Sequence, residues 1–407
     1  MHSLLLLFIA VFWVSGFSGC RPQLADEEPV LRVGVIASLR GPARPWGLAT
    51  VRCAQVIADY YNDRGGFLVQ GQRVKIELII VDDAFNASKA TSVAHDLTTD
   101  GVNYVIGPLG DSTVTAAARV LDGSGVFYVH YGFDQVIQSA NSLGVLGVPL
   151  PEQSLPILLK HLREIRHIQS VLVMAYGTEE GIRQKEIAEN LAIDAGLALV
   201  PFSSFDVSEE TFDLDLNLEN LRRKVKRIVA ADPEAILLAG CPPEACIILV
   251  DHLRQGGYLG VIATQNSQVP DLFAKIGAAS DDVYFMGGPC VDEGRSAYFK
   301  ELKARYLDLA GTWNHEAEVK LYALEFMLAC IRQAGLASLE ETSVMYRVLP
   351  DFSFVDPFYE HVEMIRVNGG MEDGLPWQMQ TVIRISKMSG GQAILIEEVS
   401  EHAPEIL

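Results

Sequence analysis

The chain has 407 residues, of which 49% are hydrophobic and 21% are charged, as in a folded globular protein of two or three domains. A formal net charge of −20 argues against binding to nucleic acids or to anionic membrane surfaces, because their phosphates would be repelled.

The N-terminal segment has the pattern of an export signal. An apolar run, in which Ser15 is the one polar residue, covers residues 4–17 and is too short to span a bilayer comfortably. The tetrad FSGC at 17–20 resembles a bacterial lipobox, with Cys20 as the acylated first residue of the mature chain. We predict an export signal over 1–19 and a lipid-anchored tether over 20–30, with an ordinary secretory signal as the alternative. The expected location is the periplasm of a Gram-negative bacterium, and the lipid anchor is the only expected membrane contact.

From residue 31 to residue 132 the chain repeats an apolar run, a turn and a helical stretch. This cadence predicts strands at 31–38, 74–81, 104–106 and 126–129. It predicts helices at 48–62, 88–99 and 112–122. The segment 143–151 carries glycines and prolines between apolar residues and is expected to cross between lobes. Alternating strands and helices indicate an α/β fold with mainly parallel sheets.

The same alternation of strands and helices is repeated after the crossing segment. Its expected helices are 154–166, 179–195, 218–231 and 243–255. Its expected strands are 170–174, 198–202, 235–239 and 261–264. Beyond residue 288 the pattern predicts helices at 296–310, 317–334 and 339–348, then strands at 363–367, 380–385 and 393–398.

Three sequence segments in the first set of strands and helices resemble a known protein family. They are LRVGVIASLRGPARPWG (31–47), IELIIVDDAFNASKATSVAHDL (76–97) and NYVIGPLGDSTVTAA (103–117). They resemble the amino-terminal lobe of the periplasmic solute-binding proteins of branched-chain amino acid ABC transporters. This resemblance implies a type I periplasmic-binding-protein fold, with two lobes, each a mainly parallel sheet flanked by helices, and a hinged cleft between them.

The resemblance also implies three crossings between the lobes. It assigns 31–150 plus about 288–375 to lobe one, and 151–287 plus about 376–407 to lobe two. A member of this family would catalyse nothing, and would capture a small molecule in the cleft and deliver it to a membrane permease. Two alternatives stay open: a carrier of a hydrophobic or lipid-like ligand for a non-ABC transport system, and a ligand sensor subunit of a signalling system.

Signatures of catalysis and of metal binding were sought in the sequence. It contains no G-x-S-x-G, H-E-x-x-H, G-x-G-x-x-G or Walker motif, so we expect no enzyme and no cofactor. Five cysteines follow Cys20, an odd number that cannot all pair internally. Cys241 and Cys246 are the nearest candidates for a disulfide, and their C-x4-C spacing is not a usual zinc spacing, so no metal is predicted. Apolar contexts predict buried thiols at the other three, Cys53, Cys290 and Cys330.

Ligand contacts are expected beyond the carboxyl ends of the parallel strands, where loops leave each sheet. In the loop 107–113, free amides at a helix N-terminus favour an anionic group, although Asp111, Ser112 or Thr113 can equally serve as an ordinary N-cap. Core packing is an equal alternative for Tyr176 and Phe133. The predicted ligand-binding residues are Trp46, Asp111, Ser112, Thr113, Tyr131, Phe133, Asp134, Tyr176, Glu180 and Gln265.

Several of these positions depart from the resembled family. Its amino acid binders hold the ligand carboxylate with a hydroxyl residue where Asp111 stands and a Thr where Asp134 stands. They hold the ammonium with a carboxylate near Gln265, and some keep a Tyr at the position of Glu180. A ligand carboxylate beside two aspartates would be repelled. The departures disfavour a free zwitterionic amino acid, and the aromatic rings favour an apolar or aromatic ligand with isolated polar atoms.

Overall fold

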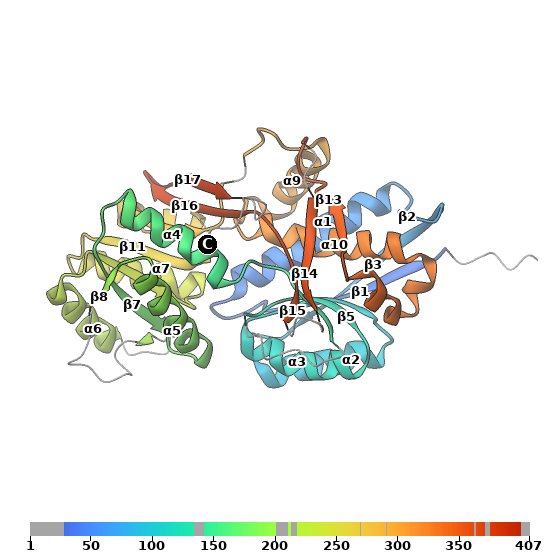
Figure 1. The fold of residues 1–407 in the computed structure, drawn as a ribbon, viewed down its shortest axis with the longest axis horizontal. Coiled ribbons are helices and arrows are strands. Elements are labelled where there is room, and N and C mark those ends of the chain that lie inside the picture. The colour runs from blue at the N-terminus through green and yellow to red at the C-terminus, as the bar shows by residue number, and fades with distance from the viewer. Residues whose placement is uncertain are drawn as a thin grey trace, which may run out of the picture.

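The computed structural model shows two lobes, each built around one sheet (Figure 1). The described residues are 28–133, 142–200, 211–212, 218–268, 270–289, 291–361, 364–370 and 375–399. The predicted export signal and the Cys20 anchor lie outside them, as do Asp134 and Cys290. No helix within these ranges is long and apolar enough to cross a membrane.

The first lobe contains a nine-stranded sheet. In chain order its strands are β1 (Val30–Ala37), β2 (Phe67–Val69), β3 (Gln72–Asp82), β4 (Tyr104–Leu109), β5 (Phe127–Tyr131), β6 (Leu143–Leu146), β13 (Ser353–Val355), β14 (Met364–Gly370) and β15 (Leu375–Met379). Their order across the sheet is β13-β14-β15-β6-β5-β4-β1-β3-β2. The neighbouring strands β3, β1, β4, β5 and β6 pair in parallel in that order, as the alternation of strands and helices predicts.

Helices cover both faces of this sheet. They are α1 (Arg44–Asp63), α2 (Ala87–Thr99), α3 (Asp111–Gly123), α9 (Ala297–Ala310), α10 (Ala317–Ala334) and α11 (Met345–Val348). Because side chains alternate along a strand, Val33 and Val35 of β1 join the core beneath α1, α9 and α10, whereas Ile36 joins the core beneath α2 and α3. Figure 1 shows these two helical layers on opposite sides of the sheet.

The second lobe repeats the arrangement. Its strands are β7 (Ser170–Tyr176), β8 (Ala198–Leu199), β9 (Thr211–Phe212), β10 (Ala235–Ala239), β11 (Val261–Ser267), β12 (Val283–Met286), β16 (Ile383–Ser389) and β17 (Gln392–Val399). Its helices are α4 (Pro151–Glu164), α5 (Glu179–Asp194), α6 (Leu218–Ala231), α7 (Pro243–Gln255) and α8 (Pro270–Ala274). The main sheet runs β17-β16-β12-β11-β10-β7-β8, with the last two strands of the chain antiparallel at one edge. One hydrophobic core lies between the sheet and helices α4 and α5, and a separate one lies between the sheet and helices α6 and α7.

The chain changes sheet three times among the described elements, after β6, after β12 and after β15. The third change falls between Met379 and Ile383, so the expected boundary at about 375 is too early. The reason is that β15 pairs in parallel with β6 of the first sheet, with Trp377 opposite Val145. Short connections at these three places keep the two lobes side by side and allow a shared cleft.

The remaining differences from the sequence predictions concern short elements. The segment expected to cross between lobes begins with β6, whose four residues are all buried and pair with β5. The helix expected at 339–348 is instead two 3₁₀ turns, Leu336–Leu339 and Thr342–Val344, followed by α11. In both places tertiary contacts outweigh a weak local pattern.

Candidate functional site

A cavity that is partly open to solvent lies between the lobes and takes its walls from both. In lobe one the walls include Gly110, which follows β4, and Tyr131, which ends β5. In lobe two they include Gln265 of β11 and Met286, which ends β12. These positions lie at the carboxyl ends of parallel strands, where ligands bind in open α/β sheets.

One end of the cleft is spanned by carboxylates that join the lobes. Glu180, in the first turn of α5, accepts a hydrogen bond at 2.9 Å from the backbone N–H of Asp111, in the first turn of α3. Its other oxygen accepts from Gln184 Nε2 at 3.0 Å, and Gln184 in turn accepts from Gln265. A chain of hydrogen bonds therefore runs from β11 of lobe two to the N-terminus of α3 in lobe one.

The Asp111 side chain is buried at the same end of the cleft. Its Oδ1 accepts from the backbone N–H of Phe133 at 2.6 Å, and its Oδ2 pairs with Arg183 Nη2 at 3.0 Å. Asp111 thus holds the loop after β5 against α3, and it binds a cation from the opposite lobe. The backbone N–H groups of Asp111 and of Phe133 therefore both have carboxylate partners.

The geometry at the start of α3 depends on Gly110. This residue has φ +86°, and a Cβ there would lie 2.7 Å from the Phe85 ring and 3.3 Å from Glu180 Oε2. The positive φ and the contact with Phe85 of the same lobe therefore require glycine here, and the space that it leaves also admits Glu180 of the opposite lobe. Glu180 is partly accessible from the cleft, and its pKa is raised, first by desolvation and then by the nearby charge of Asp111.

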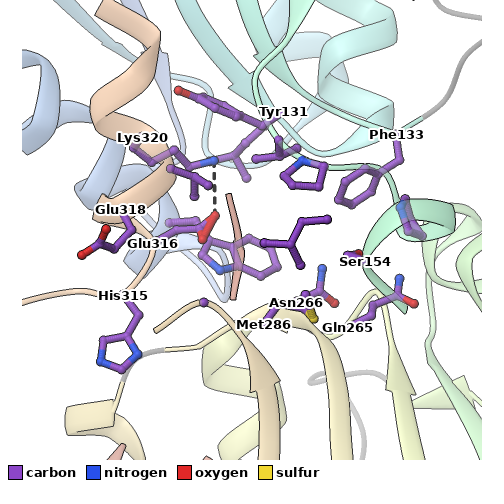
Figure 2. Close-up of a pocket in the computed structure, with 18 of the residues that line it drawn as sticks. Tyr131, Phe133, Ser154, Gln265, Asn266, Met286, His315, Glu316, Glu318 and Lys320 are labelled. Carbon is purple, nitrogen blue, oxygen red and sulfur yellow. Dashed lines mark ion pairs between the residues drawn. The ribbon is translucent and has the colours of Figure 1, made fainter. Parts of the chain in front are cut away.

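The opposite end of the cleft is formed by the start of α10. Lys320 Nζ pairs with Glu316 Oε1 at 3.3 Å and lies 3.1 Å from the centroid of the Tyr131 ring. Burial lowers the pKa of Lys320, and the adjacent Glu316 opposes that shift. Figure 2 shows Tyr131 and Lys320 entering from one side, with Gln265, Asn266 and Met286 facing them from the other.

A second buried ion-pair group joins the lobes beside α10. Glu318 Oε2 accepts from Arg295 Nη2 at 2.7 Å and lies 3.3 Å from Arg384 Nη1, which belongs to β16 of lobe two. Arg384 also pairs with Glu398 at 2.6 Å. The Arg295 guanidinium stacks on aromatic rings, 4.3 Å from the centroids of both Phe299 and Tyr359.

Apolar side chains line the middle of the cleft between these polar ends. Trp46 enters from the first turn of α1, Val319 from α10, and Met286 from the end of β12. Leu109 and Phe133 extend this apolar surface toward the α3 end. The cleft therefore suits a molecule with an apolar body and polar atoms at its ends.

The structure divides the predicted site residues into two groups. The cavity walls contain the following five: Trp46, Tyr131, Phe133, Glu180 and Gln265. Asp111 lies behind this wall and acts through Phe133, Glu180 and Arg183.

The other predicted residues have structural positions or lie outside the described residues. Thr113 is buried and donates to the carbonyls of Leu109 and Gly110, whereas Ser112 is exposed. Tyr176 packs into the core of lobe two rather than onto the cleft wall. Asp134 lies outside the described residues.

The main contribution that sequence reasoning missed is the start of α10. His315, Glu316, Glu318 and Lys320 all line the cavity and are nearly fully buried. The available signal was a run of charged residues at the start of a helix that is otherwise strongly apolar, since such charges need partners if the helix is buried.

Two α/β lobes, three crossings and a cavity lined by both lobes define a two-lobed ligand-binding protein. The model of the periplasmic binding protein family matches residues 30–380, and the chain belongs to that family.

Curated relatives match a shorter part of the chain. It is 33% identical over 99 residues to the Leu/Ile/Val-binding protein BraC3 of Rhizobium johnstonii. The matched segment covers 24% of this chain and 26% of that protein. It is 28% identical over 109 residues to the leucine-specific-binding protein of Salmonella typhimurium, covering 27% and 28% of the two chains. The matched segment thus spans about a quarter of the length of these relatives.

Solved structures share the fold over nearly the whole length. A leucine binding protein of Thermotoga maritima has a TM-score of 0.74 at 15% identity, covering 91% of this chain and 99% of that one. A solute binding protein of an ABC transporter from Rhodopseudomonas palustris, in complex with 3,4-dihydroxy benzoic acid, has a TM-score of 0.70 at 16% identity, covering 91% and 97%. At these identities the likeness shows the fold alone.

Proposed function

We propose that this protein captures a small molecule in the inter-lobe cleft and delivers it to the membrane permease of an ABC transporter. We propose further that the ligand is not a free zwitterionic amino acid. The observation that carries the second statement is the occupation of the α3 end by the protein's own carboxylates, Glu180 on the Asp111 N–H and Asp111 on the Phe133 N–H.

A helix N-terminus with free backbone amides is a favourable place for a ligand carboxylate. Here Glu180 stands where such a carboxylate would bind, and Asp111 lies beside it. An incoming carboxylate would have to displace Glu180 and would then lie beside Asp111, whose charge is offset only by the partly exposed Arg183. The α3 end therefore disfavours an anionic ligand group.

The middle of the cleft supports a ligand with an apolar or aromatic body. Trp46, Phe133 and Met286 offer two rings and a polarisable thioether, which together suit a flat or branched apolar group. A fold of this kind holds 3,4-dihydroxy benzoic acid in the Rhodopseudomonas palustris protein. The names of the curated relatives instead favour branched-chain amino acids, which makes leucine, isoleucine and valine the necessary comparison ligands.

Capture would follow from closure of the lobes, because a molecule that contacts both walls stabilises the closed arrangement. The family match, together with structurally similar binding proteins of ABC transporters, favours delivery to an ABC-type permease over the two other roles considered, a carrier for another transport system and a sensor subunit. The proposed location is the periplasm, with Cys20 as a lipid anchor.

The test is calorimetric titration of the purified protein with leucine, isoleucine and valine, and in parallel with uncharged aromatic ligands. We expect binding of an uncharged ligand, loss of that binding in Trp46→Ala, and no change in Leu259→Ala, which truncates a residue 90% exposed on lobe two. Micromolar binding of leucine by the wild-type protein, with no binding of uncharged ligands, would show that the proposed ligand class is wrong.

A further inference from the structure

We infer that the ligand's polar head binds at the start of α10, and that this head is an uncharged group offering at least two N–H or O–H donors beside one acceptor. A primary carboxamide is the simplest such group. This inference rests on the proposed function, since it specifies the ligand of the same cleft. We call this end of the cleft the α10 subsite, and its residues are His315, Glu316, Glu318, Lys320 and Arg384.

Every residue of the α10 subsite is more than nine-tenths buried, and four of their polar atoms have no hydrogen-bond partner within the described part of the chain. These atoms are His315 Nδ1, Glu316 Oε2, Glu318 Oε1 and Arg384 Nη2. Buried polar atoms in native proteins nearly always have partners, because leaving them without one is costly. The same side chains line the cavity, and because these four atoms are themselves inaccessible to solvent, a bound molecule would supply the missing partners once the side chains turn toward it.

The charges of the α10 subsite and its ion-pair partners balance. Glu316 pairs with Lys320, while Glu318 pairs with both Arg295 and Arg384, and Arg384 also pairs with Glu398. Three carboxylates therefore meet three cations. A ligand head with a net charge would add an uncompensated charge to a buried site, which is strongly unfavourable. This balance selects an uncharged head.

The hydrogen-bonding capacity of the four atoms specifies the head more closely. The oxygens of Glu316 and Glu318 can only accept, whereas Arg384 Nη2 can only donate. Burial lowers the pKa of His315 to about 3, so its ring is neutral and can adapt to either role. The complementary head offers two donors and one acceptor, as the NH₂ and C=O groups of a carboxamide do.

The orientation of the ligand follows from the two ends of the cleft. At the α3 end the backbone N–H groups of Asp111 and Phe133 already bind Glu180 and Asp111, so that end offers the ligand fewer open polar atoms than the α10 subsite, with Gln265 Oε1 among them. The head then lies against Glu316 and Lys320, and the apolar body extends past Trp46 and Met286.

The test compares three probes that share a phenyl ring and differ in their heads: phenylacetamide, phenylacetate and phenethylamine. In calorimetric titrations of the full chain we expect phenylacetamide to bind at least about tenfold more tightly than either charged probe. The inference is overturned if a charged probe binds as tightly as phenylacetamide, or if phenylacetamide does not bind up to its solubility limit.

Single substitutions test where the polar head of the ligand binds. Glu316→Gln should weaken phenylacetamide binding by about tenfold or more, because it replaces a charged acceptor with a neutral one. Glu340→Gln, an exposed glutamate outside the cavity, is the matched control and should leave the affinity unchanged. An unchanged affinity in Glu316→Gln overturns the inference. The head would then bind elsewhere, and water would donate the hydrogen bond to Glu316.

A second variant separates binding from folding. Glu316→Gln leaves Lys320 buried without its carboxylate, so the double variant Glu316→Gln/Lys320→Met removes both charges and keeps the balance. It should unfold at nearly the wild-type temperature and still bind phenylacetamide about tenfold more weakly. If the protein binds phenethylamine and Trp46→Ala abolishes this binding, the inference of an uncharged head is wrong. The proposal that the cleft captures the ligand would still hold. Binding of leucine alone would count against the proposed function as well.

Discussion

The carboxylate of Glu180 accepts a hydrogen bond from the backbone N–H of Asp111 at 2.9 Å, and it thereby joins the first turn of α5 in one lobe to the first turn of α3 in the other. This contact occupies the helix N-terminus at which an anionic ligand group would otherwise bind. It also makes closure of the cleft depend on a protein carboxylate. Two consequences can be measured, one for ligand choice and one for pH.

For ligand choice, removal of the two carboxylates should open the α3 end. The double variant Glu180→Ala/Asp111→Ser leaves the N–H groups of Asp111 and Phe133 without carboxylate partners and removes the nearby negative charge. We expect affinity for valine or benzoate to rise by about tenfold or more, measured by calorimetry. The control is Glu179→Ala, an exposed neighbour on the same turn of α5. A double variant that binds carboxylates no better than wild type would contradict the assignment of Glu180 to this position.

For pH, the raised pKa of Glu180 links closure to proton uptake. Desolvation first, and Asp111 second, raise this pKa when the lobes are in contact, whereas separation of the lobes returns it toward its ordinary value of about 4.3. The closed form therefore holds the proton more tightly than the open form. Its advantage is complete below the open-form pKa and is lost as the pH rises through the closed-form pKa.

The expected result is a ligand-free protein that is more compact at about pH 5 than at about pH 9, measured as the radius of gyration by small-angle X-ray scattering. Glu180→Gln should remove most of this difference, because it no longer titrates in that range. A wild-type radius that does not change between these conditions, or changes equally in Glu180→Gln, would show that another group controls closure.

The two side chains that Asp111 contacts should differ in importance. Arg183 is 44% exposed, so Arg183→Ala should reduce stability by less than about 1 kcal/mol. Asp111→Ala also leaves the Phe133 N–H without its acceptor, which should cost about 1–3 kcal/mol and weaken ligand binding. Urea denaturation monitored by circular dichroism, together with ligand titration, measures both effects. Equal effects of the two substitutions would mean that the Phe133 hydrogen bond contributes little.

The sequence predicted the two α/β lobes because their strands and helices are long and regular in pattern. The loops after β1, β4 and β5 were predicted for the same reason, since the carboxyl ends of parallel strands meet at one edge of a sheet. Trp46, Tyr131 and Phe133 were found in this way, and all three line the cavity. By contrast, Tyr176 ends a strand but its side chain enters the core, because local pattern does not specify which face a terminal residue takes.

The α10 side of the cleft could not be predicted in the same way. α10 is buried on nearly all sides, so its sequence indicates a core helix with no distinct face. Only tertiary structure brings Glu316 and Lys320 beside Tyr131, which is almost 190 positions earlier in the sequence. Likewise, Arg384 reaches Glu318 only because β16 belongs to the second lobe, a consequence of the third crossing.

The buried pair of Glu318 with Arg295 and Arg384 should control stability more than any surface ion pair. Glu318→Ala removes the carboxylate shared by two guanidinium groups that are nearly fully buried. Leaving a buried charge without its partner typically costs about 3–5 kcal/mol. We therefore expect a loss of this size in the free energy of unfolding, measured by urea denaturation in the absence of ligand.

The chain offers a matched control for this substitution. Glu301 also lies between two arginines, Arg64 and Arg305, but it is 37% exposed. Water replaces its interactions when it is removed, so Glu301→Ala should reduce stability by less than about 1 kcal/mol. The comparison isolates burial, because both substitutions remove a glutamate shared by two arginines. Similar losses for the two variants would mean that water reaches Arg295 and Arg384 in the folded protein, and that the ion pairs beside α10 are as well solvated as those on the surface.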